Sequence, residues 1–150
     1  MENVEHKLEV LSTIAEHFHK EDITWAVGAS LLLYLKGKTD VFHDIDIMIM
    51  ESDVEKVKTV MSRLGIIQPP NPNVQYKTKY FIECIVDDVD VDIMAGFAIV
   101  NNGTEYDCSL KKCEISESIP INKQAIPLHS LELWKRYYEL MGRTEKAAML

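Results

Sequence analysis

Two strongly apolar runs each carry a pair of aspartates at alternating positions, and this pattern constrains the fold more than any other feature. The run DIDIMIM contains Asp44 and Asp46, and the run VDVDIM contains Asp90 and Asp92. Side chains alternate between faces along a β-strand, so each acidic pair projects from one face and the aliphatic residues from the other. If the two strands lie in one sheet, three or four carboxylates converge on one place.

A cluster of carboxylates is unfavourable by itself, because each negative charge disfavours ionisation of its neighbours. It becomes favourable around Mg²⁺, which takes oxygen ligands and completes its shell with substrate phosphates. A pair of such ions can hold both the attacking and the leaving oxygen when one group displaces another in line at phosphorus. The ordinary alternative for either pair alone is a set of solvated aspartates at the end of a strand. Two such pairs in one chain favour a metal site.

The rest of the chain alternates helical and strand-like patterns. Helices are predicted at 2–20, 30–37, 52–65, 130–142 and 144–150, the third opened by a capping box from Ser52 to Glu55. Strands are predicted at 23–27 and 44–50. A loop at 68–73 is followed by two hairpins, with turns around 87–88 and 102–103. This order predicts an α+β (mixed α/β) domain over residues 1–150, with a central mixed sheet and helices packed against it.

Composition restricts the partners and the compartment. The formal charge of −8 argues against a protein that binds nucleic acid through a broad basic surface. The three cysteines lack the spacing of a zinc site, and an odd count fits reduced thiols. The sequence shows neither a signal-peptide pattern nor an apolar run long enough to span a bilayer, so a cytoplasmic protein is expected.

The stretch WAVGAS, from Trp25 to Ser30, predicts a strand that ends at Gly28 and a helix that follows at once. Glycine lets a backbone approach a ligand closely, and the free N–H groups of a helix start attract phosphate. Any turn between a strand and a helix can use glycine, so the stretch is a weak signal alone. The sequence has no glycine-rich dinucleotide motif and no P-loop motif.

Together, the Gly28-Ala29-Ser30 turn, the helix after it, the D-I-D strand and the later acidic strand resemble the nucleotidyltransferase superfamily of DNA polymerase β. The similarity is greatest to small aminoglycoside- and lincosamide-type and minimal nucleotidyltransferases. The resemblance implies that Gly28, Ala29 and Ser30 lie near the phosphates of a nucleoside triphosphate. It also implies that Asp44 and Asp46 are metal ligands.

The third acid in this family binds metal and helps to deprotonate the acceptor hydroxyl. Periodicity alone leaves Asp90 and Asp92 as equal candidates, because both lie on the same face. The resemblance favours Asp92, which is followed by two apolar residues as the third acid of the family usually is.

The last helix, SLELWKRYYELMGR, resembles the family more loosely. This resemblance makes Lys135 and Arg143 candidate phosphate or acceptor contacts, and Arg136 a weaker one, for which a solvated basic face is at least as good an explanation. The chain departs from its relatives at Ala29, where a G-G or G-S turn is usual, and at 144–146, where many relatives have Pro-Lys-Asp. Because of these departures, the resemblance does not identify the acceptor substrate.

The resemblance implies transfer of a nucleoside monophosphate from an NTP to a hydroxyl acceptor, with Mg²⁺ or Mn²⁺ and release of pyrophosphate. The acceptor, which can be small or macromolecular, and the preferred base stay open. The alternative is a non-catalytic binding partner of the same fold, such as an antitoxin. A protein partner or a homodimer is compatible with either function.

Overall fold

The computed structural model describes residues 3–69, 78–115 and 117–150. Its α-helices are α1 (Val4–Lys20), α2 (Ala29–Leu35), α3 (Val54–Leu64), α4 (Leu131–Leu140) and α5 (Thr144–Ala148), with 3₁₀ turns η1 (Glu51–Asp53) and η2 (Lys112–Glu114). Its strands are β1 (Trp25–Val27), β2 (Ile45–Ile49), β3 (Ile66–Ile67), β4 (Tyr80–Val86), β5 (Val89–Ala95), β6 (Ala98–Asn101), β7 (Thr104–Asp107), β8 (Glu117–Ile121) and β9 (Gln124–Leu128). None of the described helices combines the length and the apolar character that crossing a membrane requires.

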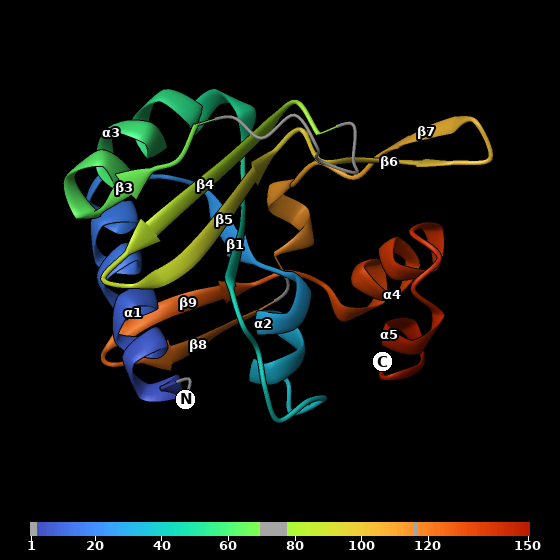
Figure 1. Cartoon of the computed structure of the whole chain (residues 1–150), viewed down its shortest axis with the longest axis horizontal. Helices are drawn as coiled ribbons and strands as arrows, with labels where there is room; N and C mark the ends of the chain where they lie inside the picture. Colours follow the sequence, from blue (N-terminus) through green and yellow to red (C-terminus); the bar gives the residue numbers. More distant parts are fainter. Residues whose placement is uncertain (1–2, 70–77, 116) are drawn as a thin grey trace.

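Seven strands form one sheet in the order β3-β4-β5-β2-β1-β9-β8. The sheet is mixed, because β2 runs parallel to β5 and β1 parallel to β9, while the other neighbours are antiparallel. Strands β6 and β7 form a separate hairpin that extends away from the sheet (Figure 1). The predicted α+β class with a central mixed sheet is therefore confirmed.

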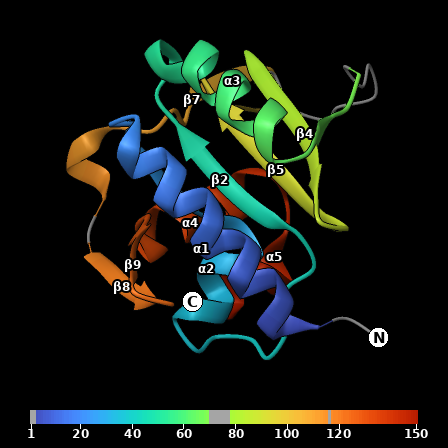
Figure 2. The ribbon, with the colours of Figure 1, turned by 90° about the vertical axis from the view of Figure 1, so that its left-hand side faces the viewer.

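The two faces of the sheet differ in chemistry. One face buries the aliphatic residues of β2 and β5, including Ile45, Ile47, Val91 and Ile93, all with no exposed surface. Helices α1 and α3 lie side by side over this face, and α4 and α5 lie on the opposite side of the sheet (Figure 2). The alternation of side chains therefore directs the acids of β2 and β5 towards α4 and α5.

Both predicted hairpins are confirmed. Asp87 and Asp88 connect β4 to β5 with φ of 50° and 68°, and Asn102 and Gly103 connect β6 to β7 with φ of 50° and 79°. Two consecutive left-handed residues match the right-handed twist of a hairpin, and Asp, Asn and Gly are the residues that adopt this conformation most readily.

The hairpin of β8 and β9 was absent from the predicted order of elements. Pro120 and Pro127 fall within these strands, and proline in a sequence argues against a strand because it cannot donate to the ladder. The sheet tolerates both, because β8 lies at its edge and β9 pairs with β1 only through Leu128 and Val27.

The predicted capping box is wrong. Ser52 lies inside η1, and α3 begins one residue later than the box requires, with Asp53 as its N-cap and no side-chain capping bond. The Asp53 carboxylate instead accepts a hydrogen bond from the Thr24 N–H at 3.1 Å. Of the predicted loop at 68–73, residues 70–73 lie outside the described residues.

Candidate active site

A cavity of about 290 Å³ lies between the acidic face of the sheet and the C-terminal helices. It is lined by acids from β2, from β5 and from the residue before β2, by the start of α2, by a histidine, by a set of apolar side chains, and by two cations near the C-terminus. They are Asp44, Asp46, Asp92, Ala29, Ser30, His43, Phe81, Met94, Phe97, Trp134, Tyr138, Met141, Arg143 and Lys146.

Strand register places the acids of the two strands next to each other. β2 and β5 are parallel neighbours in which Asp46 is paired with Asp92, so their side chains project from the same face at adjacent positions. Asp44 lies just before β2 and lines the same cavity. Asp90 is exposed and lies outside this cavity. The cavity therefore gathers Asp92 rather than Asp90 with the first two acids.

Burial and charge repulsion both act on Asp46. Burial raises the pKa of Asp46 well above its usual value, and the charges of Asp92 and Asp44 raise it further. The positive charges of Lys146 and Arg143 lower the same pKa. The two cations therefore face the acids closely enough to stabilise the charged form of Asp46.

Asp92 and Asp44 form a coupled pair. Burial raises the pKa of Asp92 to about 7, with contributions from the charges of Asp44, Glu83 and Asp90 and from a hydrogen bond with Asp44. Burial, followed by the charge of Asp90, also raises the pKa of Asp44, whereas the hydrogen bond with Asp92 lowers it. One proton shared between the two carboxyl groups explains why the bond shifts the two pKa values in opposite directions.

The turn before α2 is tightly packed. Ala29 has φ of 50°, which costs energy for a residue with a side chain, and it lines the cavity together with Ser30. Gly28 does not line the cavity. A Cβ atom on Gly28 would lie 2.5–2.8 Å from three atoms of the Trp134 indole, so the absence of a side chain permits this contact.

One face of α4 forms the wall opposite the acids. Trp134, Tyr138 and Met141 recur at helical spacing and line the cavity. Lys135 and Arg136 are exposed and lie outside the cavity, and the Arg136 guanidinium lies 6.0 Å from the ring centroid of Tyr106. Of the basic residues that the resemblance pointed to, the cavity therefore includes only Arg143.

Sequence reasoning missed the second cation of the cavity, Lys146, and three of its apolar side chains, Phe81, Met94 and Phe97. Lys146 occupies the segment in which the chain departs from the usual Pro-Lys-Asp of its relatives, so its place in the cavity was not evident. Phe81 and Met94 project from the same face as Asp92, because Phe81 pairs with Met94 across β4 and β5. Period-2 alternation was therefore the available signal for both.

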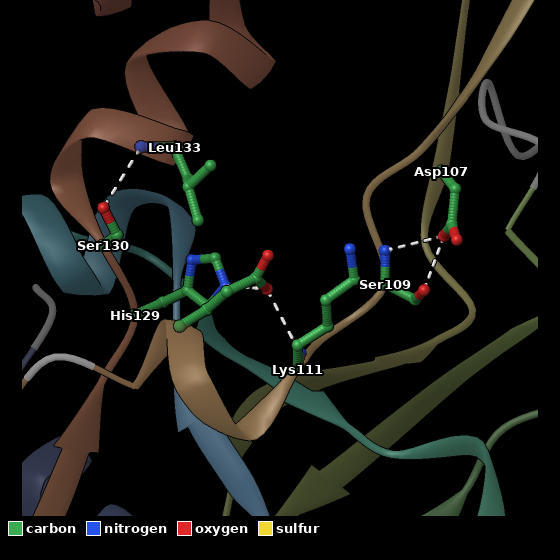
Figure 3. Close-up of polar contacts among 7 residues, drawn as sticks. Asp107, Ser109, Lys111, His129, Ser130 and Leu133 are labelled. Carbon is green, nitrogen blue, oxygen red and sulfur yellow. Dashed lines mark hydrogen bonds and ion pairs between the residues drawn. The ribbon is translucent and has the colours of Figure 1, made fainter.

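The start of α4 is held by two polar contacts (Figure 3). The Ser130 hydroxyl accepts a hydrogen bond from the Leu133 N–H at 3.3 Å, which caps the helix. The His129 ring is buried, and its Nε2 atom lies 3.2 Å from the Glu114 carboxylate. These contacts fix the junction between β9 and α4, and through it the position of Trp134.

No group of three or more His, Cys, Asp or Glu side chains within residues 3–69, 78–115 and 117–150 converges closely enough to enclose a metal ion. Mg²⁺ does not require such a cage, because it is usually bound through one or two carboxylates together with substrate phosphates. The acids of the cavity fit this open arrangement. Their oxygens are suitable ligands, and burial first and neighbouring carboxylates second raise the pKa values of Asp44 and Asp46, so a cation would stabilise their charged forms.

The sequence matches the family model of aminoglycoside-2''-adenylyltransferases over residues 10–149. The chain belongs to this adenylyltransferase family. The predicted membership of the nucleotidyltransferase superfamily and the predicted class of enzyme are thereby confirmed. Among curated proteins, none matches the sequence.

Several solved structures are similar to this chain in fold. TM1012 of Thermotoga maritima, assigned to the nucleotidyltransferases, has a TM-score of 0.77 and 27% identity, over 95% of this chain and 89% of TM1012. ANT(2'')-Ia in complex with adenylyl-2''-tobramycin has a TM-score of 0.66 and 11% identity, over 96% of this chain and 87% of the other. The lincosamide adenylyltransferase LnuA, bound to lincomycin, has a TM-score of 0.62 and 16% identity, over 94% of both chains. At these identities, the last two show the fold alone.

Proposed function

We propose that this member of the adenylyltransferase family transfers a nucleoside monophosphate from an NTP to a hydroxyl group, with Mg²⁺ or Mn²⁺ held by one or two carboxylates of the set Asp44, Asp46 and Asp92 together with the phosphates. The observation that carries the proposal is the composition of the cavity. Three carboxylates from two neighbouring segments of the sheet face Arg143 and Lys146 across it. Such a site can hold a phosphate chain between a metal on one side and cations on the other.

The residues have distinct roles in this proposal. Asp44 and Asp46 supply carboxylate oxygens to the metal, which when bound neutralises charge that develops on the phosphate. Arg143 and Lys146 offset phosphate charge from the opposite wall. Ala29 and Ser30 present the start of α2 to the nucleotide, with Gly28 directly before them. Lys135 and Arg136, outside the cavity, are left with a role at its rim or with none.

Asp92 is proposed as the group that accepts the proton of the acceptor hydroxyl. Without metal, the pKa of Asp92 is about 7, raised mainly by burial. A bound cation lowers this pKa and favours the ionised carboxylate, which is the form that can accept a proton. Its hydrogen bond with Asp44 orients the carboxylate. Apolar contacts with Phe81 and Met94 on the same face limit the access of water that would compete with the acceptor.

We further propose that the acceptor carries amino groups. Two other acids adjoin the reacting centre: Glu83 is paired with Asp92 across β4 and β5, and Asp90 lines a neighbouring cavity together with Glu83 and Asp44. A cationic acceptor compensates this negative charge. The solved complex of ANT(2'')-Ia with adenylyl-2''-tobramycin makes an amino-sugar acceptor the first class to test.

The test is turnover with ATP or GTP and Mg²⁺, with tobramycin, lincomycin or no acceptor, measured as pyrophosphate release and as the mass of the product. The proposal expects release that depends on both metal and acceptor, a nucleotidylated product, and loss of both in Asp46→Asn. Product formed equally well without metal, or by Asp46→Asn, contradicts the proposed site. Turnover with lincomycin but not tobramycin contradicts the amino-sugar acceptor while leaving the reaction intact.

A further inference from the structure

Helix α1 buries a lysine where an aliphatic residue is expected. Lys7 is 7% exposed and shares its buried face with Val10, Leu11 and Ile14. Lysine is almost never buried to this extent unless its ammonium group is paired, because removing the charge from water is costly. The position therefore requires a compensating contact.

The compensating contact lies in the segment that carries the first acid of the site. The Lys7 ammonium donates a hydrogen bond to the Phe42 carbonyl at 3.0 Å and lies 5.3 Å from the centroid of the Phe42 ring. Phe42 is 1% exposed, and its ring centroid is 4.9 Å from that of Tyr34 in α2. Lys7 thus joins α1 to a backbone position two residues before Asp44.

This segment has no regular structure that would hold it otherwise. Residues 36–44 connect α2 to β2 without helix or strand. Lys7 and Asp44 also line one cavity together with Asp88 and Asp90. The lysine therefore contacts the backbone of this segment and lies beside the same cavity as its acid.

We propose that Lys7 is a positioning residue of the active site, which anchors the Phe42–Asp44 segment so that Asp44 is presented to the metal. The proposal rests on the proposed function, because it assigns Lys7 a role through a metal ligand. Lys7 does not line the catalytic cavity and does not touch the reacting atoms.

The first measurement uses the metal-free protein and is independent of activity. Hydrogen exchange is compared in wild type, Lys7→Met, Lys7→Arg and Lys20→Met. Lys20 lies on the same helix and is exposed, and its ammonium group lies 3.4 Å from the Glu16 carboxylate. The amides of 40–46 are expected to exchange about fivefold faster or more in Lys7→Met, the factor of one ordinary hydrogen bond. Unchanged exchange in this segment overturns the anchoring role.

The second measurement is Mn²⁺ affinity by calorimetry, per folded molecule, in the same variants and in Asp46→Asn. Removing a cation makes the local potential more negative, so a lysine that acts only by its charge gives tighter Mn²⁺ binding in Lys7→Met. A positioning lysine gives weaker binding, about tenfold, because the ligand is misplaced, and Lys7→Arg restores most of it. Lys20→Met is expected to match wild type in both measurements.

These outcomes distinguish the positioning role of Lys7 from the proposed metal site. Tighter or equal Mn²⁺ binding in Lys7→Met, with weaker binding in Asp46→Asn, overturns the positioning role and leaves the metal site intact. Equal binding in Asp46→Asn and wild type overturns the metal site, and the role of Lys7 with it.

Discussion

Asp46 is the residue on which burial and charge repulsion act together. Burial and the negative charges of Asp92 and Asp44 destabilise its charged form. The positive charges of Lys146 and Arg143 offset this only in part. We expect Asp46→Asn to make the metal-free protein more stable near neutral pH, because the substitution removes a charge that burial and two neighbouring carboxylates oppose. Chemical denaturation in EDTA measures this change. Asp90→Asn, at an exposed acid outside the cavity, is the control and should change stability less. A destabilised Asp46→Asn means that Asp46 has a structural partner.

Asp92 links stability to pH in the direction opposite to that of most acids. Its pKa in the folded protein is about 7, above the unfolded value of about 3.9. Between these values the folded state binds more protons than the unfolded state, so this group makes stability fall as pH rises, by at most about 1.4 kcal/mol per pH unit. We expect Asp92→Asn to flatten the pH dependence of unfolding of the metal-free protein between about pH 4 and 7. An unchanged slope contradicts the raised pKa.

Gly28 permits a contact that any side chain would block. Its φ of −138° is ordinary extended backbone, so the cost of a substitution is steric. We expect Gly28→Ala to destabilise the protein by about 1–3 kcal/mol through overpacking against Trp134.

A double-mutant cycle with Trp134→Leu tests the cause, since removing the indole should remove most of the cost of Gly28→Ala. Additive effects contradict a direct clash. If folded Gly28→Ala also loses NTP affinity in calorimetry, the turn additionally approaches the phosphates, as the family resemblance implies. Unchanged affinity leaves Gly28 with a packing role only.

At the scale of elements, the start of α3 shows how a local pattern can be overridden. Ser52 and Glu55 have the spacing of a capping box, but Ser52 lies in η1. The Asp53 carboxylate accepts a hydrogen bond from the N–H of Thr24, the residue before β1. We expect Ser52→Ala to change the free energy of unfolding by less than about 0.5 kcal/mol, as at a neutral surface position. Asp53→Ala should cost about 1–2 kcal/mol, since it removes a charged acceptor. Thermal or denaturant unfolding of the two single variants distinguishes them, and the reverse ranking would restore the capping box.

At the scale of the whole molecule, ligand binding should couple the sheet to the C-terminal helices, because residues from both line the cavity. ATP with Mg²⁺ at about 100 times the dissociation constant should stabilise the protein by about 2.7 kcal/mol. Asp46→Asn, measured at the same ligand concentration, should lose most of that gain even if it is more stable without metal. Equal stabilisation of both proteins would show that the ligand binds elsewhere.

Local patterns in the sequence were sufficient for much of the fold and for the face of the acids. Period-2 alternation predicted that Asp44 shares a face with Asp46, and Asp90 with Asp92. The turn residues at 87–88 and 102–103 predicted the two hairpins that they form. These features depend on side-chain direction and backbone preference within a few residues, which a single sequence records. The sequence did not predict the hairpin of β8 and β9, because both strands contain proline. These prolines are tolerated because β8 lies at the edge of the sheet and β9 has a single pair with β1, which are properties of the assembled sheet.

The sequence by itself determined which residue types could form a phosphate and metal site, and in which phase along each strand. Only the tertiary structure decided that β2 and β5 are neighbours, which chose Asp92 over Asp90 for the cavity. It also decided that Trp134 occupies the space beside Gly28, and that Lys7 reaches Phe42 from 35 residues away. Each of these depends on packing between segments distant in the chain, where the energy of a contact is set by shape and burial rather than by local preference.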